Sequence, residues 1–278
     1  MLGKNFSVDP LPYFEVFGFR VYWYGVIIAC GFILAVSYAL ARKKEFGLTE
    51  DNIIDMLIFA VPIGIIGARL YYVVFNFDLY RDDLAGIFRI RDGGLAIYGG
   101  VIFSVLTAYV FSRVKKIPFG ALLDDVAIPL LIGQSVGRWG NFMNREAYGS
   151  VTNVLWRMGI TLSDGSVIFV HPTFLYESLW NLLGIIVLHF WSKKQRLFDG
   201  HLFLMYLTWY GVGRGIIEGL RSDSLYLFST GIRVSQLLAV LTAAASVTLM
   251  AVMAADYKKN ASNSESDTSE TDIIKEEK

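Results

Sequence analysis

The stretch VAIPLLIGQSVGRWGNFMNREAYG, residues 126–149, joins an apolar run to a polar cluster and decides the fold class. Its first eleven residues carry no charge, whereas the next thirteen contain two arginines, two asparagines and one glutamate. A helix of about 20 apolar residues crosses a bilayer core of about 30 Å. The stretch is therefore typical of a membrane-spanning helix with polar groups gathered at one end.

The composition of the whole chain agrees with a membrane protein. Of the 278 residues, 54% are hydrophobic and 18% are charged, which is more apolar and less charged than an average soluble domain. We expect an all-α polytopic membrane protein with seven transmembrane helices. The seven windows are Tyr22–Ala41, Met56–Phe75, Gly94–Ser112, Phe119–Phe142, Phe174–Trp191, His201–Leu220 and Val234–Ala255.

Two segments outside these windows predict small strand pairs. FEVFGFRVYW, residues 14–23, has a glycine turn, and LWRMGITLSDGSVIFV, residues 155–170, places Asp164 and Gly165 at a hairpin position. We expect an N-terminal arm of residues 1–21, a seven-helix domain of residues 22–256 and a tail of residues 257–278. The tail is rich in ions and poor in large apolar groups, so we expect it to be disordered.

Basic residues predict the orientation in the membrane. ARKKEF follows the first window, SRVKKIP the third, WSKKQR the fifth and DYKKN the seventh, so every second loop is basic. Short loops rich in lysine and arginine stay on the cytoplasmic side. We therefore expect the N-terminus outside the cell and the C-terminus in the cytoplasm.

With this orientation, polar side chains converge on the outer half of the membrane. A charged side chain at the bilayer centre costs about 2.5 to 3.5 kcal/mol on insertion scales, so such residues mark partners or sites. Tyr24 also suits an interfacial aromatic belt, and Arg69 also suits snorkelling to the interface. The converging residues are Tyr24, Arg69, Tyr98, Arg138, His171, Tyr176, Glu177, Arg214 and Glu218.

Arg214 and Glu218 stand four residues apart and share one helix face, which Arg221 continues. Glycines surround them in YGVGRGIIEG, and glycine allows another helix or a ligand to come close. A structural ion pair is one interpretation, since paired charges are tolerated in membranes. A polar pocket open toward the outer lipid is the other.

The polar half of the opening stretch repeats this pattern. Helical spacing predicts Arg138, Asn141 and Arg145 on one face, with Asn144 and Glu146 where the helix leaves the membrane. Arginine offers a rigid fork of donors that suits a phosphodiester. Together with Arg214, this face predicts a site for the headgroup of an anionic phospholipid.

Several other classes of protein do not fit. The last window has no lysine, as a retinal receptor requires, and the chain has no DxxDGxxAR run, as a CDP-alcohol phosphotransferase requires. The three histidines, at 171, 189 and 201, are scattered, so we expect no metal site. We also expect no cofactor and no nucleic-acid partner.

The segment GRWGNFMNREAYG resembles the signature GRxGNFxNxExxG of the bacterial phosphatidylglycerol:prolipoprotein diacylglyceryl transferase family, with every fixed position filled. The resemblance covers residues 23–255. Five companion segments stand in the same order as in the family: WYG at 23–25, GARLYYV at 67–73, DGGLAIYGG at 92–100, HPTFLYE at 171–177 and GRGIIEGLR at 213–221.

The resemblance implies an enzyme of the bacterial cytoplasmic membrane. Such enzymes move the diacylglyceryl group of phosphatidylglycerol onto the thiol of the lipobox cysteine in a prolipoprotein signal peptide, which forms a thioether and releases glycerol phosphate. By resemblance, Arg138 and Arg214 hold the phosphate, and Glu218 orients Arg214 or moves a proton. The residues implied to bind substrate are Arg138, Asn141, Asn144, Glu146, Gly149, Tyr24 and Arg69.

Tyr98 departs from the family pattern, in which many members carry histidine that has been considered as the base. A phenol with a pKa near 10 is a poor base at neutral pH. Either Tyr98 positions the substrate, or base duty falls to Glu218, Glu146 or water. The alternative function is a non-catalytic or transporting membrane protein that binds anionic phospholipid through the same arginines.

Overall fold

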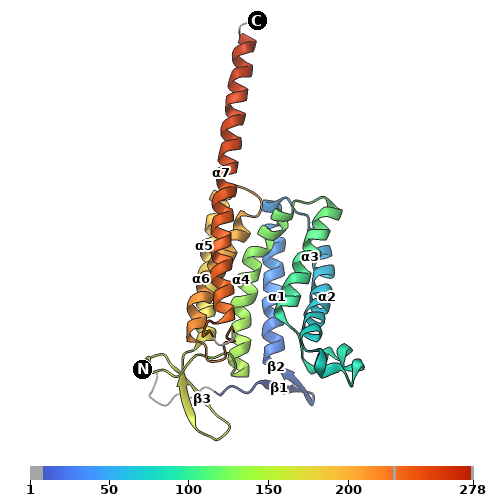
Figure 1. Cartoon of the computed structure of the whole chain (residues 1–278), viewed down its shortest axis with the longest axis vertical. Coiled ribbons are helices and arrows are strands. Elements are labelled where there is room, and N and C mark those ends of the chain that lie inside the picture. The colour runs from blue at the N-terminus through green and yellow to red at the C-terminus, as the bar shows by residue number, and fades with distance from the viewer. Residues whose placement is uncertain (1–8, 228–229, 277–278) are drawn as a thin grey trace. The chain divides into compact units, whose positions relative to one another are not determined.

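The structure is a computed structural model that describes residues 9–227 and 230–276 (Figure 1). Over these residues it contains seven α-helices and two sheets of two strands each. Contacts divide the chain into two compact units. One contains Met1–Tyr38 and Val126–Lys278, and the other contains Ala39–Asp125.

Six helices in the described part of the chain are long and apolar enough to cross a membrane. They are α1 (Trp23–Arg42), α2 (Glu50–Phe75), α3 (Ile97–Lys115), α4 (Phe119–Asn144), α5 (Thr173–Gln195) and α7 (Val234–Glu276). The remaining helix, α6 (His201–Ile217), has 17 residues and continues into a 3-10 turn, η5 (Glu218–Leu220). The expectation of a helical membrane protein is confirmed, and the seventh span stays a prediction because α6 is shorter than the roughly 20 residues that a span needs.

Both predicted strand pairs are present. β1 (Tyr13–Val16) pairs with β2 (Phe19–Tyr22), and β3 (Met158–Thr161) pairs with β4 (Val167–Val170), each antiparallel. Gly18 and Gly165 have φ angles of 81° and 82° in the two connecting turns. This left-handed region favours glycine, so the sequence fixes where each hairpin turns.

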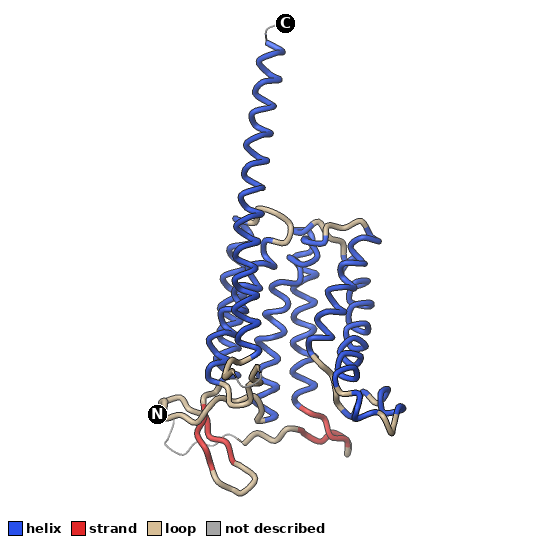
Figure 2. Tube along the Cα trace, in the orientation of Figure 1, coloured by secondary structure: helices blue, strands red, loops and turns tan. Residues whose placement is uncertain are grey.

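α7 continues beyond its apolar segment, and the disordered tail stays a prediction. Figure 2 shows α7 as one uninterrupted helix, and its backbone stays helical to Glu276. A helix that the apolar segment has already nucleated extends with one new hydrogen bond per residue, so polar composition alone does not end it. Residues 277–278 of the tail and residues 1–8 of the N-terminal arm lie outside the described residues.

In the unit of residues 39–125, α2 and α3 pack together through glycines. A Cβ added to Gly67 of α2 would lie 2.3 Å from Cγ of Phe103 of α3. One added to Gly99 of α3 would lie equally close to the carbonyl oxygen of Gly67. Such distances are far inside van der Waals contact, so this pair of helices requires glycine at both positions.

In the other unit, two tryptophans hold α5 against α6. The indole N–H of Trp180 donates to the Trp209 carbonyl, the indole N–H of Trp209 donates to the Trp180 carbonyl, and both distances are 3.0 Å. The two rings stack with centroids 4.6 Å apart. Gly213 and Gly184 leave room for these rings, and Gly211 leaves room for α7. The sequence left open whether the glycines of α6 make room for a helix or for a ligand. Gly211 and Gly213 make room for neighbouring helices.

The same unit gathers several helix ends. The start of α1, the end of α4, the start of α5 and the end of α6 lie together at the bottom of Figure 1. β2 leads directly into α1 at Trp23. The polar segments expected at one side of the membrane and belonging to this unit are therefore brought to one end of its helices.

Gly67→Ala is expected to destabilise the protein by about 1–3 kcal/mol, because the new methyl group overpacks the contact with Phe103. The measurement is thermal unfolding of the purified protein in detergent. Gly133→Ala in α4 is the matched control, since a Cβ there meets nothing within 4 Å. Equal melting temperatures for the two variants would contradict the close packing of α2 on α3.

Candidate active site

Two arginines from different helices share one buried carboxylate. Glu177 of α5 places Oε2 2.5 Å from Nη2 of Arg138 of α4 and Oε1 3.0 Å from Nη1 of Arg214 of α6. Glu177 is only 5% exposed. A buried charge is stable when it is paired and hydrogen-bonded, so this carboxylate joins α4, α5 and α6 at one ionic centre.

The end of α6 extends this centre. Glu218 places Oε2 2.6 Å from Nη2 of Arg214, and its Oε1 accepts a hydrogen bond from the Ser224 hydroxyl at 2.8 Å. Nη1 of Arg221 lies 3.7 Å from Oε1 of Glu177. The predicted stripe of Arg214, Glu218 and Arg221 is therefore present, and a carboxylate from another helix completes it.

Arg221 also forms a forked contact with Asp223. Its Nε and Nη2 donate to the two carboxylate oxygens at 2.9 and 2.7 Å. These hydrogen bonds hold the pKa of Asp223 below its ordinary value. Asp223 is therefore an anion at neutral pH and the third carboxylate beside the arginines.

The signature segment folds back on itself through its amides. Nη1 of Arg138 lies 3.4 Å from the side-chain oxygen of Asn141, whose amide donates to Oε1 of Glu146 at 2.8 Å. The Asn144 amide reaches the same oxygen at 3.4 Å. Four of the residues expected in the site are therefore connected, from partly buried Arg138 to exposed Glu146.

Arg145 does not belong to this network. α4 ends at Asn144, and Arg145 takes a left-handed φ of 53°. Its guanidinium points to Asp9, with Nη1 3.3 Å from Oδ1. The expected face of Arg138, Asn141 and Arg145 is wrong at its third position, because the helix stops one residue too early.

The signature glycines Gly137 and Gly140 let α1 lie against α4. A Cβ on Gly140 would lie 2.8 Å from Cδ2 of Tyr24, and one on Gly137 would lie 3.4 Å from Cδ1 of Ile28. Tyr24 therefore packs on the same helix that carries Arg138. This contact places Tyr24 beside the signature, as expected, and gives Gly140 a packing role.

Gly149 ties together three segments of the chain. Its N–H donates to the His171 carbonyl at 2.9 Å, and the next N–H, of Ser150, donates to the Leu220 carbonyl at 2.7 Å. A Cβ on Gly149 would lie 2.6 Å from Cβ of His171 and 2.9 Å from the Leu220 oxygen. Only glycine fits here. Gly149 lies against the backbone of Leu220, just before Arg221.

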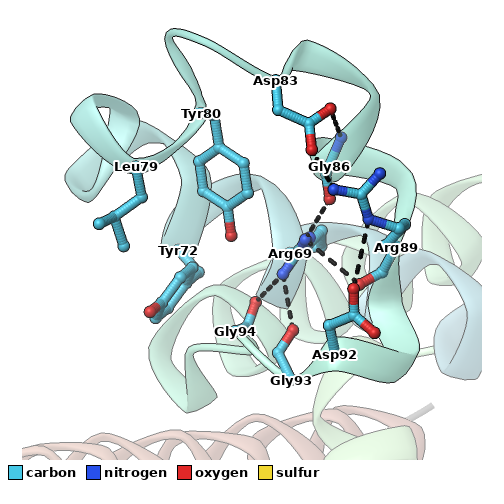
Figure 3. A pocket seen from close by; sticks show the side chains of 10 residues that line it. All are labelled: Arg69, Tyr72, Leu79, Tyr80, Asp83, Gly86, Arg89, Asp92, Gly93 and Gly94. Atoms are coloured by element: carbon cyan, nitrogen blue, oxygen red, sulfur yellow. Dashed lines mark hydrogen bonds and ion pairs between the residues drawn. The ribbon is translucent and has the colours of Figure 1, made fainter.

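Arg69 belongs to the other unit, where it holds a loop. All five N–H groups of its buried guanidinium donate to backbone carbonyls between α2 and α3, and Figure 3 shows the loop around it. The acceptors are Gly86, Ile87, Arg89, Gly93 and Gly94, at 2.6 to 3.4 Å. Arg69 therefore holds this loop through its guanidinium, and its expected role in lipid binding stays a prediction.

A small pocket of about 150 Å³ opens beside Arg69. Tyr72, Leu79, Tyr80 and Asp83 are among the residues that line it (Figure 3). Tyr98 lies in the same unit, in the first turn of α3, with its side chain partly exposed. The Ala96 N–H, just before it, donates to the Ala68 carbonyl at 3.0 Å, which fixes the start of α3 on the helix that carries Arg69.

Glu177 was expected among the converging polar residues, but it was assigned no catalytic or binding role. Its signal was present, since it is an ionisable side chain at the start of an apolar window and ends the segment HPTFLYE. What the sequence does not reveal is that arginines of two other helices meet it. Within the described part of the chain, no group of three or more histidine, cysteine, aspartate or glutamate side chains is placed to hold a metal ion.

Comparisons with known proteins agree with the signature. The sequence pattern of the family described as prolipoprotein diacylglyceryl transferase matches residues 12–252. A phosphatidylglycerol–prolipoprotein diacylglyceryl transferase of Listeria welshimeri is 45% identical over 250 residues, which cover 87% of this chain and 89% of the relative. Proteins of the same name from Finegoldia magna and Clostridioides difficile are 43% and 44% identical, over 88% and 77% of this chain and 95% and 84% of their own lengths. The chain belongs to the prolipoprotein diacylglyceryl transferase family.

Proposed function

We propose that this protein transfers the diacylglyceryl group of phosphatidylglycerol to the thiol of a lipobox cysteine in a prolipoprotein, forming a thioether and releasing glycerol phosphate. The named relatives cover most of the chain and carry this activity in their names. The observation that supports it most is the pairing of Arg138 and Arg214 on one buried carboxylate, next to the family signature.

The two arginines bind the phosphodiester of the lipid. Each guanidinium has five N–H donors, and the ionic contacts with Glu177 and Glu218 use only part of them. The remaining donors of Arg138 and Arg214 form two forks held in fixed relation to each other. Such forks suit phosphate oxygens and stabilise the negative charge that develops on the departing glycerol phosphate.

The transfer exchanges one bond for another. The cysteine thiol loses its proton, the sulfur attacks the diacylglyceryl carbon next to the phosphate, and the carbon–oxygen bond breaks. The bonding electrons leave with glycerol phosphate. A thiol with a pKa near 8.5 needs a base for this step at neutral pH.

Two carboxylates and water are the candidates for that base. Glu146 is exposed and accepts hydrogen bonds from the amides of Asn141 and Asn144. Glu218 is fully buried and bound to Arg214 and Ser224. Exposure makes Glu146 the more accessible carboxylate for an incoming peptide, and the pairing of Glu218 makes it the better support for Arg214. Tyr98 is then a residue that positions substrate.

We also propose the placement of the protein in a bacterial cytoplasmic membrane. It crosses the membrane seven times, with the N-terminus outside and the tail from residue 257 in the cytoplasm, as the basic loops indicate. The end of the helices that carries Arg138 and Glu177 then faces the outer leaflet. Tyr24, packed on Gly140, lines the path by which lipid arrives.

The purified protein is expected to move label from phosphatidylglycerol labelled in its acyl chains to a lipobox peptide. Mass spectrometry of the peptide measures the added diacylglyceryl group, and a peptide with serine in place of the cysteine is the control. Lipid binding without any modified cysteine would favour the alternative of a non-catalytic or transporting lipid-binding protein.

Arg138→Lys is expected to lower the rate of transfer by about 10²-fold or more, because a point charge cannot replace a two-pronged donor aimed at developing charge. Arg145→Lys is the matched control seven residues along, since Arg145 contacts exposed Asp9 and should tolerate the change. Initial rates with the same lipid and peptide measure both variants. Equal rates for the two variants would remove the Arg138 fork from the mechanism.

A further inference from the structure

We propose that Glu177 sets the charge preference of the phosphate site, so that it holds the singly charged diester substrate and rejects the doubly charged monoester product. This inference rests on the proposed function. It assigns to Glu177 a specificity role beyond its structural contact with the arginines.

The first observation is the position of the carboxylate. Glu177 lies between Arg138 and Arg214, with one oxygen on each, and is 5% exposed. Any phosphate that uses the remaining donors of these two guanidinium groups lies within a few ångströms of the same carboxylate. Both anions would contact the same two guanidinium groups, whose side chains are only 20% and 15% exposed, so little water can screen one anion from the other.

The second observation is the charge balance of the centre. In the part of the chain that the structure describes, Arg138, Arg214 and Arg221 face three carboxylates. These carboxylates are Glu177, Glu218 and Asp223. These ion pairs therefore join three positive charges to three negative ones, and Arg233 lies outside them, with its guanidinium on the carbonyls of Glu218 and Arg221. A phosphate ester is then held by directed hydrogen bonds rather than by surplus positive charge, and each further negative charge on it is repelled.

The substrate and the product differ by that further charge. A phosphodiester carries one negative charge, whereas a phosphate monoester has a second ionisation near pH 6 and carries almost two at neutral pH. Like charges a few ångströms apart in a partly buried site repel each other. Breaking the carbon–oxygen bond therefore converts a tolerated ligand into a repelled one, which favours release of glycerol phosphate.

Glu177 is the carboxylate best placed for this role. Glu218 contacts Arg214 and Ser224, but no contact is described between it and Arg138. Asp223 is paired with Arg221, and its side chain is 50% exposed, so water screens its charge. Only Glu177, among the described carboxylates, touches both arginines proposed to bind the phosphate.

The test uses two soluble headgroup probes that differ mainly by one charge: glycerol phosphate and its methyl ester. Calorimetric titration at pH 7.5 into the full-length protein in detergent gives a dissociation constant for each. The wild type is expected to bind the methyl ester at least about tenfold more tightly, the size of effect that one nearby buried charge produces. Glu177→Gln is expected to lose most of this preference by binding glycerol phosphate more tightly.

Asp223→Asn is the matched control, since it removes one negative charge at an exposed position and should change the preference much less. Glu177→Asp keeps the charge and should keep the preference. A wild type that binds glycerol phosphate as tightly as the methyl ester overturns the proposal without any variant. The proposal is also overturned if Glu177→Gln changes the dissociation constants of glycerol phosphate and its methyl ester by the same factor, because the preference is then unchanged.

The same preparation separates this inference from the proposed function. Diacylglyceryl transfer by the wild type, measured on a lipobox peptide, tests the function. A protein that shows the charge preference but transfers nothing would support the role of Glu177 and contradict the proposed function. A protein that transfers the diacylglyceryl group without any charge preference would support the function and contradict the role of Glu177.

Discussion

A carboxylate buried among apolar helices is stable only if cations reach it, and the Glu177 contacts with Arg138 and Arg214 meet that need. Breaking such a pair by removing one partner leaves an uncompensated charge, which is typically worth several kcal/mol. The surrounding structure keeps the three helices close enough for the contacts to form. Trp180 and Trp209 fix α5 against α6 through two reciprocal hydrogen bonds.

The family signature serves packing as much as chemistry. Gly137 and Gly140 face α1, and Gly149 lies so close to other backbone that no side chain fits. Arg138 and Asn141, between and beside these glycines, begin the polar network that ends at Glu146. The fixed positions therefore divide into residues that bring segments together and residues that present donors and acceptors.

The helices and hairpins were predictable because their information is local. Apolar windows predicted the helices, with bounds within a few residues except at the start of α2 and the end of α7, and glycine turns predicted both strand pairs. What the sequence does not reveal depends on contacts between segments or on how a helix ends. Arg145 leaves the predicted face because one left-handed residue ends α4, and Arg69 turns to loop carbonyls that no periodicity reveals. Glu177 was visible as an ion in an apolar window, but its partners lie 37 and 39 residues away.

The central claim is that Arg138 and Arg214 act on one phosphate. A double-mutant cycle tests it directly, with kcat/KM for diacylglyceryl transfer measured in Arg138→Lys, Arg214→Lys and the double variant. If both forks hold the same phosphate, the first substitution already spoils the shared geometry, so the double variant loses much less than the product of the single losses. Losses that multiply would mean that the two arginines act independently, and would contradict the account.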